Sequence, residues 1–241
     1  IPLIHGPDGA KLSKRHGALG VEAYRDMGFL PEAMRNYLLR LGWGHGDEEI
    51  IPTEKAIEWF DLDAVGRSPS RFDMAKLENL NAHYLREAED DRLVALILPL
   101  LADRLGQPVA DSGKTLLKAG MAGLKPRAKT LVELADSALF YLRPLPLPFT
   151  DKAAALLTEE ARQVLAKLAT ALDGEADWTE AALEARVRSF AEAEALKLGT
   201  VAQPLRAALT GSTTSPGIFD VLAVLGRDAA IARIRAAVGG N

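Results

Sequence analysis

The sequence predicts a mainly α-helical protein, in which a small α/β region precedes two all-helical domains. Apolar residues recur at spacings of three and four in a series of windows: 92–105, 130–142, 158–172, 180–198, 201–210 and 217–239. The same half shows no convincing period-two alternation with β-branched residues, so any strands are expected within about the first 90 residues. The segment Pro144–Pro148 alternates proline with leucine and cannot continue a helix, so it should divide the helical half near residue 149.

Glycine, proline and threonine set the expected helix limits in the first region. A short helix is expected over 21–27, and Pro31 should start a second one at its favoured first position. The apolar stripe of that second helix should face the core: Met34, Leu38 and Leu41. Thr53 can cap a third helix that runs through Phe60, and Phe72 should begin the next.

Composition describes a globular protein of two or three domains, with 241 residues, 48% of them apolar and 26% charged. The apolar run Leu93–Leu101 is too short to span a membrane and should be a buried helix. The absence of cysteine excludes disulfides and thiolate metal sites and fits a reducing compartment. Ile1–Ile4 reads as a strand entered from elsewhere, with no signal-peptide layout. We therefore expect the C-terminal half of a longer protein.

The net charge of −4 argues against a protein that coats nucleic acid without specificity. The charges are, however, unevenly distributed along the chain. Residues 114–129 carry five cations and no acid: Lys114, Lys118, Lys125, Arg127 and Lys129. Residues 151–184 carry eight acids against three cations. Such segregation can attract phosphate to one side of the molecule, but each run can equally be a solvated face, and both interpretations stay open.

The most informative motif is Lys11-Leu12-Ser13-Lys14-Arg15-His16-Gly17-Ala18, which follows a glycine-rich turn. Two mobile ammonium groups and a hydroxyl at this spacing suit the phosphates of ATP, because they can follow negative charge as it shifts between oxygens. The alternative is a solvated basic turn. The octet resembles the second signature of class I aminoacyl-tRNA synthetases, in its glutamyl-tRNA synthetase form.

Other segments resemble the same family in the same order, so the resemblance covers essentially the whole chain: Pro31–Trp43, Gly46–Glu48, Phe72–Leu77, Val201–Gly211 and Ser215–Phe219. The resemblance implies four parts. Residues 1–18 would end the catalytic domain, and 19–88 would form a small α/β stem-contact domain. Residues 89–149 and 150–241 would form two all-helical anticodon-binding domains.

The resemblance implies a glutamate–tRNA ligase, which activates glutamate with ATP and transfers it to the 3′ end of tRNA(Glu). Lys14 would be the primary catalytic residue contacting ATP, supported by Lys11 and Ser13, while His16 is expected to be structural. The first class I signature, His-x-Gly-His, is missing, and His45 is no substitute for it. The nucleotide fold and the glutamate pocket would then precede this chain, which should be inactive alone.

The resemblance also implies residues that bind the anticodon, where unpaired bases are held by stacking and by hydrogen bonds to their edges. Ser215 and Ile218 correspond to base-contacting positions, although Ser215 could instead cap a helix with Pro216 at its first position. Arg127 is the candidate for reading the third anticodon base. Arg206 could face phosphate or pair with an acid, and both alternatives stay open.

Three alternatives fit the sequence less well than this hypothesis. Glutaminyl-tRNA synthetases read the anticodon with β-barrels, which the helical periodicity disfavours, and a non-catalytic helical tRNA-binding module has no use for a phosphate-binding lysine loop. A truncated tRNA-modifying relative would lack the helical domains. The expected partners are ATP with Mg²⁺, L-glutamate and tRNA(Glu), for a cytoplasmic monomer with no membrane segment and no metal site in this chain. The sequence leaves open whether tRNA(Gln) is also charged.

Overall fold

The computed structural model describes residues 2–6, 8–12 and 20–239. Within these residues the chain is mainly helical, and its strands are two short ones, β1 (Ile4–His5) and β2 (Ser70–Arg71). The predicted fold class and the confinement of strands to the first 90 residues are therefore confirmed. Two compact units form, one from residues 1–97 and 128–134 and the other from 98–127 and 135–241. The four-part division expected from the sequence stays a prediction.

The strands of the first unit make a minimal parallel pair, in which Ile4 lies opposite Ser70 and His5 opposite Arg71. The chain then turns back, and Lys11 forms an antiparallel bridge with His5. The amide of Leu12 donates to the carbonyl oxygen of Ile4 over 2.9 Å. The start of the lysine motif is thus held in a hairpin beside the strand pair.

Four helices complete most of the first unit: α1 (Val21–Asp26), α2 (Pro31–Arg40), α3 (Thr53–Trp59) and α4 (Met74–Glu87). Their core joins buried aromatic and aliphatic side chains: Tyr24, Phe29, Met34, Tyr37 and Leu77. Tyr37 donates its hydroxyl to the carbonyl oxygen of Asp73 over 3.0 Å and accepts the amide of Asp73 over 2.6 Å. Helix α2 is thereby fixed to the start of α4.

Three details of the first region were predicted wrongly. Leu38 is 48% exposed, because the buried face of α2 is rotated toward Asn36 and Tyr37. Thr53 is the first residue of α3 and not its cap, since Pro52 occupies the cap position. Helix α4 starts at Met74, where the Asp73 side chain accepts the amide of Lys76 over 3.2 Å. Phe72 therefore precedes the helix that it was expected to begin.

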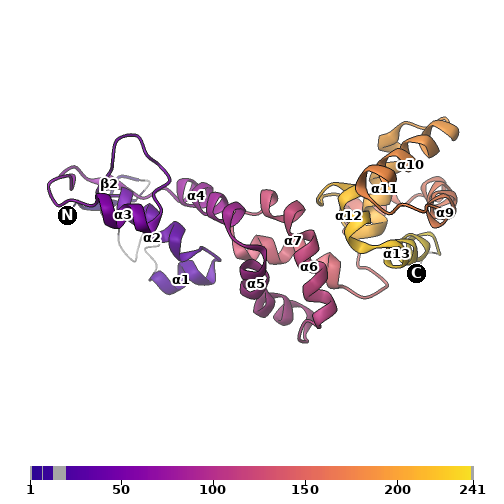
Figure 1. Cartoon of the computed structure of the whole chain (residues 1–241), viewed down its shortest axis with the longest axis horizontal. Coiled ribbons are helices and arrows are strands. Elements are labelled where there is room, and N and C mark those ends of the chain that lie inside the picture. Colours follow the sequence, from indigo (N-terminus) through magenta and orange to yellow (C-terminus); the bar gives the residue numbers. More distant parts are fainter. Residues whose placement is uncertain (1, 7, 13–19, 240–241) are drawn as a thin grey trace. The chain divides into compact units, whose positions relative to one another are not determined.

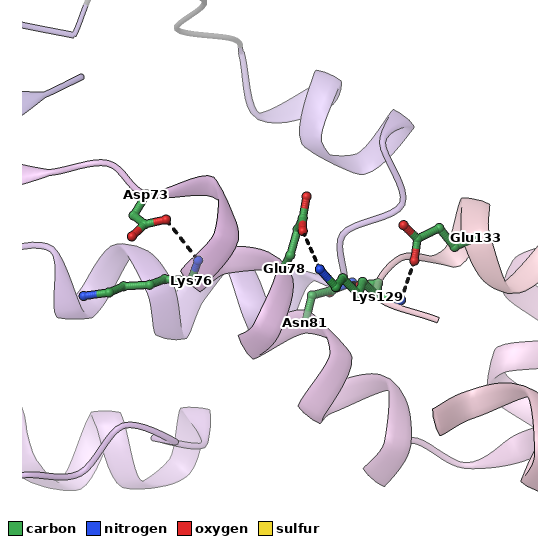
Figure 2. A network of polar contacts seen from close by, with 6 residues as sticks. All are labelled: Asp73, Lys76, Glu78, Asn81, Lys129 and Glu133. Carbon is green, nitrogen blue, oxygen red and sulfur yellow. Dashed lines mark hydrogen bonds and ion pairs between the residues drawn. The ribbon is translucent and has the colours of Figure 1, made fainter. Parts of the chain in front are cut away.

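Segment 128–134 belongs to the first unit and is attached to α4 through polar contacts (Figure 2). Asn81 is fully buried, and its amide nitrogen donates to the carbonyl oxygen of Lys129 over 2.5 Å. Its amide oxygen accepts the backbone amide of Leu30 over 2.7 Å. The ammonium of Lys129 lies 3.1 Å from a carboxylate oxygen of Glu78. One buried amide thus joins three segments that are distant in the sequence.

The remaining helices follow in chain order (Figure 1): α5 (Asp90–Leu105), α6 (Asp111–Leu124), the 3-10 helix η2 (Lys125–Arg127), α7 (Leu131–Leu142), α8 (Asp151–Leu156), α9 (Glu159–Asp173), α10 (Glu180–Ala193), α11 (Leu198–Thr210), α12 (Ile218–Leu225) and α13 (Arg227–Gly239). All six helical windows predicted from periodicity contain a helix. Helix α5 buries Leu93, Ile97 and Leu101 completely, as expected for the run 93–101. Helices α6 and α8 were not predicted.

Threonine side chains start several helices of the second unit. Thr150, Thr158 and Thr179 each accept the backbone amide three residues on, at the beginnings of α8, α9 and α10. Residues 143–150 contain neither helix nor strand, as the prolines predict. Throughout the described part of the chain, no helix is both long and apolar enough to cross a membrane.

Candidate functional site

A polar cleft of about 440 Å³ lies within the second unit. Its lining combines two arginines, a carboxylate, several hydroxyl groups and a few apolar side chains: Arg127, Asp136, Ser137, Leu139, Phe140, Arg143, Pro148, Thr150, Thr210, Gly211, Ser212, Thr214, Ser215 and Pro216. Asp136 pairs with Arg104 over 2.5 Å, so its negative charge is offset. The cleft therefore presents positive charge together with groups that donate and accept hydrogen bonds.

Arg127 reaches this cleft because of how α6 ends. The helix stops at Leu124, Lys125 continues in helical conformation, and one 3-10 turn carries Arg127. Ala128, directly after it, is buried, whereas Arg127 itself is exposed. Its guanidinium is thus presented to solvent from the end of a packed helix, and its donors can serve a ligand.

Arg206 holds the turn formed by residues 215–217, of which Ser215 and Pro216 line the cleft. Its Nη1 atom donates to the carbonyl oxygens of Ser215 over 3.3 Å and Pro216 over 2.7 Å, and also to the Ser215 hydroxyl. Burial lowers the pKa of Arg206, and the positive charge of Arg127 lowers it further. The two arginines are therefore close enough to repel each other within the second unit.

These contacts disfavour two of the alternatives that the sequence left open. Helix α12 begins at Ile218 with Gly217 at the cap position and no side-chain cap, so Ser215 does not cap it. The Ser215 hydroxyl instead donates to the carbonyl oxygen of Pro216 over 2.8 Å. The hydrogen bonds described for the Arg206 guanidinium go to oxygen atoms of the turn and not to an acid.

The four residues predicted to bind RNA thus fall into three positions. Arg127 and Ser215 line one cleft, although they are far apart in the sequence. Arg206 holds the turn that carries Ser215. Ile218 is 5% exposed at the start of α12 and does not line the cleft.

Only the first residue of the predicted phosphate-binding set is described. Lys11 is exposed at the edge of its hairpin, a position that suits contact with an anion. Ser13, Lys14 and His16 lie outside the described residues. In the part of the chain that the structure describes, no group of three or more histidine, cysteine, aspartate or glutamate side chains could hold a metal ion.

Comparison with known proteins identifies both parts of the chain. The model of the anticodon binding domain family matches residues 80–238. The chain belongs to this anticodon-binding domain family. Residues 1–79 match a second family, the catalytic domain of class I tRNA synthetases (E and Q).

Relatives of this anticodon-binding chain include two bacterial glutamate–tRNA ligases. The chain is 64% identical over 234 residues to glutamate–tRNA ligase 2 of Rhodospirillum centenum, covering 97% of this chain and 50% of the relative. It is 61% identical over 242 residues to glutamate–tRNA ligase 2 of Paramagnetospirillum magneticum, covering 100% and 51%. The chain thus spans about half the length of the curated relatives it matches, and the resemblance to glutamyl-tRNA synthetases is confirmed.

A solved structure shares the fold of this anticodon-binding chain. It is a glutamate tRNA ligase from Elizabethkingia meningosepticum, with a TM-score of 0.82 and 27% sequence identity. The match covers 98% of this chain and 50% of that one. The mainly helical architecture is therefore shared with the matched half of that ligase.

In the folded structure, acidic side chains from outside the stretch 114–129 offset part of its positive charge. Lys114 pairs with Asp111 over 2.8 Å, one turn earlier in α6. Lys129 pairs with Glu78 of α4. Acids just outside the stretch, and from another helix, thus offset part of its charge, so charge alone does not define the site.

Arg143, Thr150, Ser212 and Thr214 also line the cleft of this family member but were not predicted from the sequence. A signal existed for the last two, because residues 212–215 form an unbroken run of hydroxyl side chains beside the Ser-Pro-Gly motif. No sequence signal marks Arg143 or Thr150. They flank the proline segment, and the fold alone brings them to the cleft.

His45, which was excluded as a catalytic residue, has a visible structural role. Its ring stacks on Trp59 with centroids 4.4 Å apart and on Trp43 with centroids 6.2 Å apart. The ammonium of Lys55 lies 5.4 Å from the centre of the Trp59 ring. This aromatic stack joins the turn after α2 to helix α3.

Proposed function

We propose that this chain forms the anticodon-reading part and the end of the catalytic domain of a glutamate–tRNA ligase. The observation that carries the proposal is the cleft that joins Arg127 to Ser215 within a chain of the anticodon-binding family. The match of residues 1–79 to a synthetase catalytic domain supports the enzymatic part.

The reaction consists of two transfers. The glutamate carboxylate attacks the α-phosphorus of ATP and pyrophosphate leaves; the 3′-terminal hydroxyl of tRNA(Glu) then attacks the glutamyl carbonyl carbon and AMP leaves. Lys14, with Lys11 and Ser13, would hold the phosphates, and Mg²⁺ would accompany ATP. Positioning and charge neutralisation are the main contributions of such a loop. The exposed ammonium of Lys11 is consistent with this role.

The cleft would bind unpaired anticodon bases. Arg127 has a planar fork of donors, which suits acceptors on a base edge, and the hydroxyl groups can bond base edges or sugar. Arg143 would add positive charge for the backbone. We further propose that the enzyme acts as a cytoplasmic monomer on tRNA(Glu). Activity on tRNA(Gln) depends on how strictly the third anticodon base is read.

Substitution of Lys14 tests the enzymatic proposal in the full-length protein. Lys14→Ala should slow ATP–pyrophosphate exchange by about 100-fold or more, the scale of removing one preorganised charge at a transition state. Lys152→Ala removes an exposed lysine of α8 and should leave exchange unchanged. Binding of the anticodon arm should be unaffected by either change. Exchange near the wild-type rate in Lys14→Ala would instead favour the alternative, a non-catalytic tRNA-binding module.

A further inference from the structure

Helix α6 lies close to the turn at 215–217 at Gly123. A Cβ atom placed on Gly123 would lie 2.8 Å from the Cβ atom of Pro216 and closer still to Oδ2 of Asp220. Carbon atoms in good contact are about 3.5–4.0 Å apart, so a side chain cannot be accommodated without movement. Glycine inside a helix costs roughly 0.5–1 kcal/mol relative to alanine, and this close approach is a physical reason for its presence.

Gly123 and Arg127 are four residues apart. Side chains at this spacing lie on the same face of a helix, and Lys125 and η2 continue the helical path to Arg127. The face of α6 that touches Pro216 is therefore the face that leads to Arg127. Both Arg127 and Pro216 line the cleft.

The turn itself has little freedom to retreat. Arg206 holds the carbonyl oxygens of Ser215 and Pro216. Just before the turn, the carbonyl oxygen of Gly211 accepts the amide of Thr150 over 2.9 Å. An added methyl group at Gly123 would consequently displace the end of α6, and Arg127 with it, more readily than the turn.

We propose that Gly123 is a positioning residue for anticodon specificity, whose missing side chain lets α6 seat against Pro216 and Asp220 so that Arg127 and Ser215 share one cleft. The inference rests on the proposed anticodon reading and extends it to a residue that need not touch RNA.

The test measures dissociation constants of this chain for two RNA hairpins. One is the anticodon arm of tRNA(Glu), and the other carries the third anticodon base of tRNA(Gln). Gly123→Ala should reduce the preference for the first hairpin by at least about fivefold, the lower range for losing a well-placed base contact. Thermal unfolding and circular dichroism of each variant show whether it is folded.

Two other glycines provide matched controls. Gly199→Ala, in α11, meets no atom within 4 Å and reports the general effect of alanine in a helix. Gly113→Ala lies in α6 itself, where a Cβ would meet Leu142 and Val109 at 2.9 Å, and reports overpacking away from the turn. Both should keep the preference. An equal loss in Gly113→Ala would show that any disturbance of α6 suffices and would overturn the inference.

If Gly123→Ala does not fold, the double variant Gly123→Ala with Asp220→Ala removes the closest overlap and is measured instead. The double variant should fold and still show a reduced preference for the tRNA(Glu) hairpin, because the overlap with Pro216 remains. Asp220→Ala alone should keep the wild-type preference. A wild-type preference in folded Gly123→Ala, or in the folded double variant, would overturn the inference. A wild-type chain that does not distinguish the two hairpins would contradict the proposed anticodon reading itself.

Discussion

Arg206 donates a hydrogen bond from its guanidinium to the carbonyl oxygen of Pro216 over 2.7 Å. Pro216 is buried, and a buried carbonyl without a partner is costly. The same Nη1 atom also serves the carbonyl oxygen of Ser215. One side chain of α11 thereby defines the conformation of the turn that forms a wall of the cleft.

Replacing Arg206 should therefore affect both stability and RNA binding. Arg206→Leu leaves two turn carbonyls without this donor and should lower the free energy of unfolding by roughly 1–3 kcal/mol. It should weaken binding of both anticodon hairpins, because the turn loses its fixed shape. Arg188→Leu is the control, since that arginine pairs with Glu184 on the exposed face of α10 and should change stability by about 0.5 kcal/mol or less. Equal urea-unfolding curves for both variants would contradict the bracing role.

Arg127 should discriminate between anticodon bases and not merely attract the phosphate backbone. Arg127→Gln should cost roughly 1–3 kcal/mol of discrimination between tRNA(Glu) and tRNA(Gln), by analogy with bidentate base contacts. Lys118→Gln is the control, because Lys118 is exposed on the preceding helix α6 but does not line the cleft. Both variants are measured against both tRNAs at two salt concentrations. Equal, salt-sensitive losses with an unchanged preference would reduce Arg127 to a phosphate contact.

The helical half was predictable because its packing uses long apolar side chains at regular spacing. Leu165, Leu168 and Leu172 of α9 are fully buried at spacings of three and four, as periodicity requires. Helix α6 was missed because three glycines, at 113, 120 and 123, lower its helix propensity. At each of these glycines a Cβ would lie within 3.0 Å of a neighbouring residue, so the residues that weaken the local signal are those that allow close packing.

The site could be predicted only as a set of separate residues. Arg127 and Ser215 were found through the family resemblance, but nothing in the spacing shows that they share a cleft. The alternative interpretation of Ser215 as a helix cap fails for a clear reason. Ser-Pro is a common helix start, yet here the hydroxyl is engaged by Arg206 and Pro216, and the helix begins two residues after Pro216. Tertiary partners of a polar side chain are not encoded locally.

Asn81 should be among the most sensitive polar positions of the first unit (Figure 2). Asn81→Leu leaves the amide of Leu30 and the carbonyl oxygen of Lys129 without their partner. The expected loss is about 2–4 kcal/mol of unfolding free energy, since each buried group left unpaired costs about 1–3 kcal/mol. Glu78→Gln removes only the half-exposed pair with Lys129 and should cost about 1 kcal/mol at most. Urea unfolding compares the two, and a similar loss for both would contradict the importance of the buried amide.

Glu32 should make part of the stability of the first unit depend on pH. Burial is the largest influence and raises the pKa of this carboxyl. Hydrogen bonds from Arg92 at 2.6 and 3.0 Å, a backbone hydrogen bond and the positive charges of Arg92 and Arg35 together outweigh burial, so the pKa of Glu32 lies below its ordinary value of 4.5. A carboxylate with a lowered folded pKa contributes stability that is present above its unfolded pKa and is lost as pH falls through the folded pKa.

Glu32→Gln should therefore lower the free energy of unfolding at pH 7 by about 0.5–1 kcal/mol, a magnitude limited by the half-exposed Arg92 side chain. The difference between wild type and variant should shrink as the pH falls below about 4.5. Urea unfolding at several values between pH 3 and 7 measures it, and taking the difference cancels the titration of the other carboxyl groups. Glu58→Gln, which removes an exposed pair with Lys55, should show a smaller difference. A difference for Glu32→Gln that stays constant across this range would mean that the side chain stabilises α2 through packing and not through its charge.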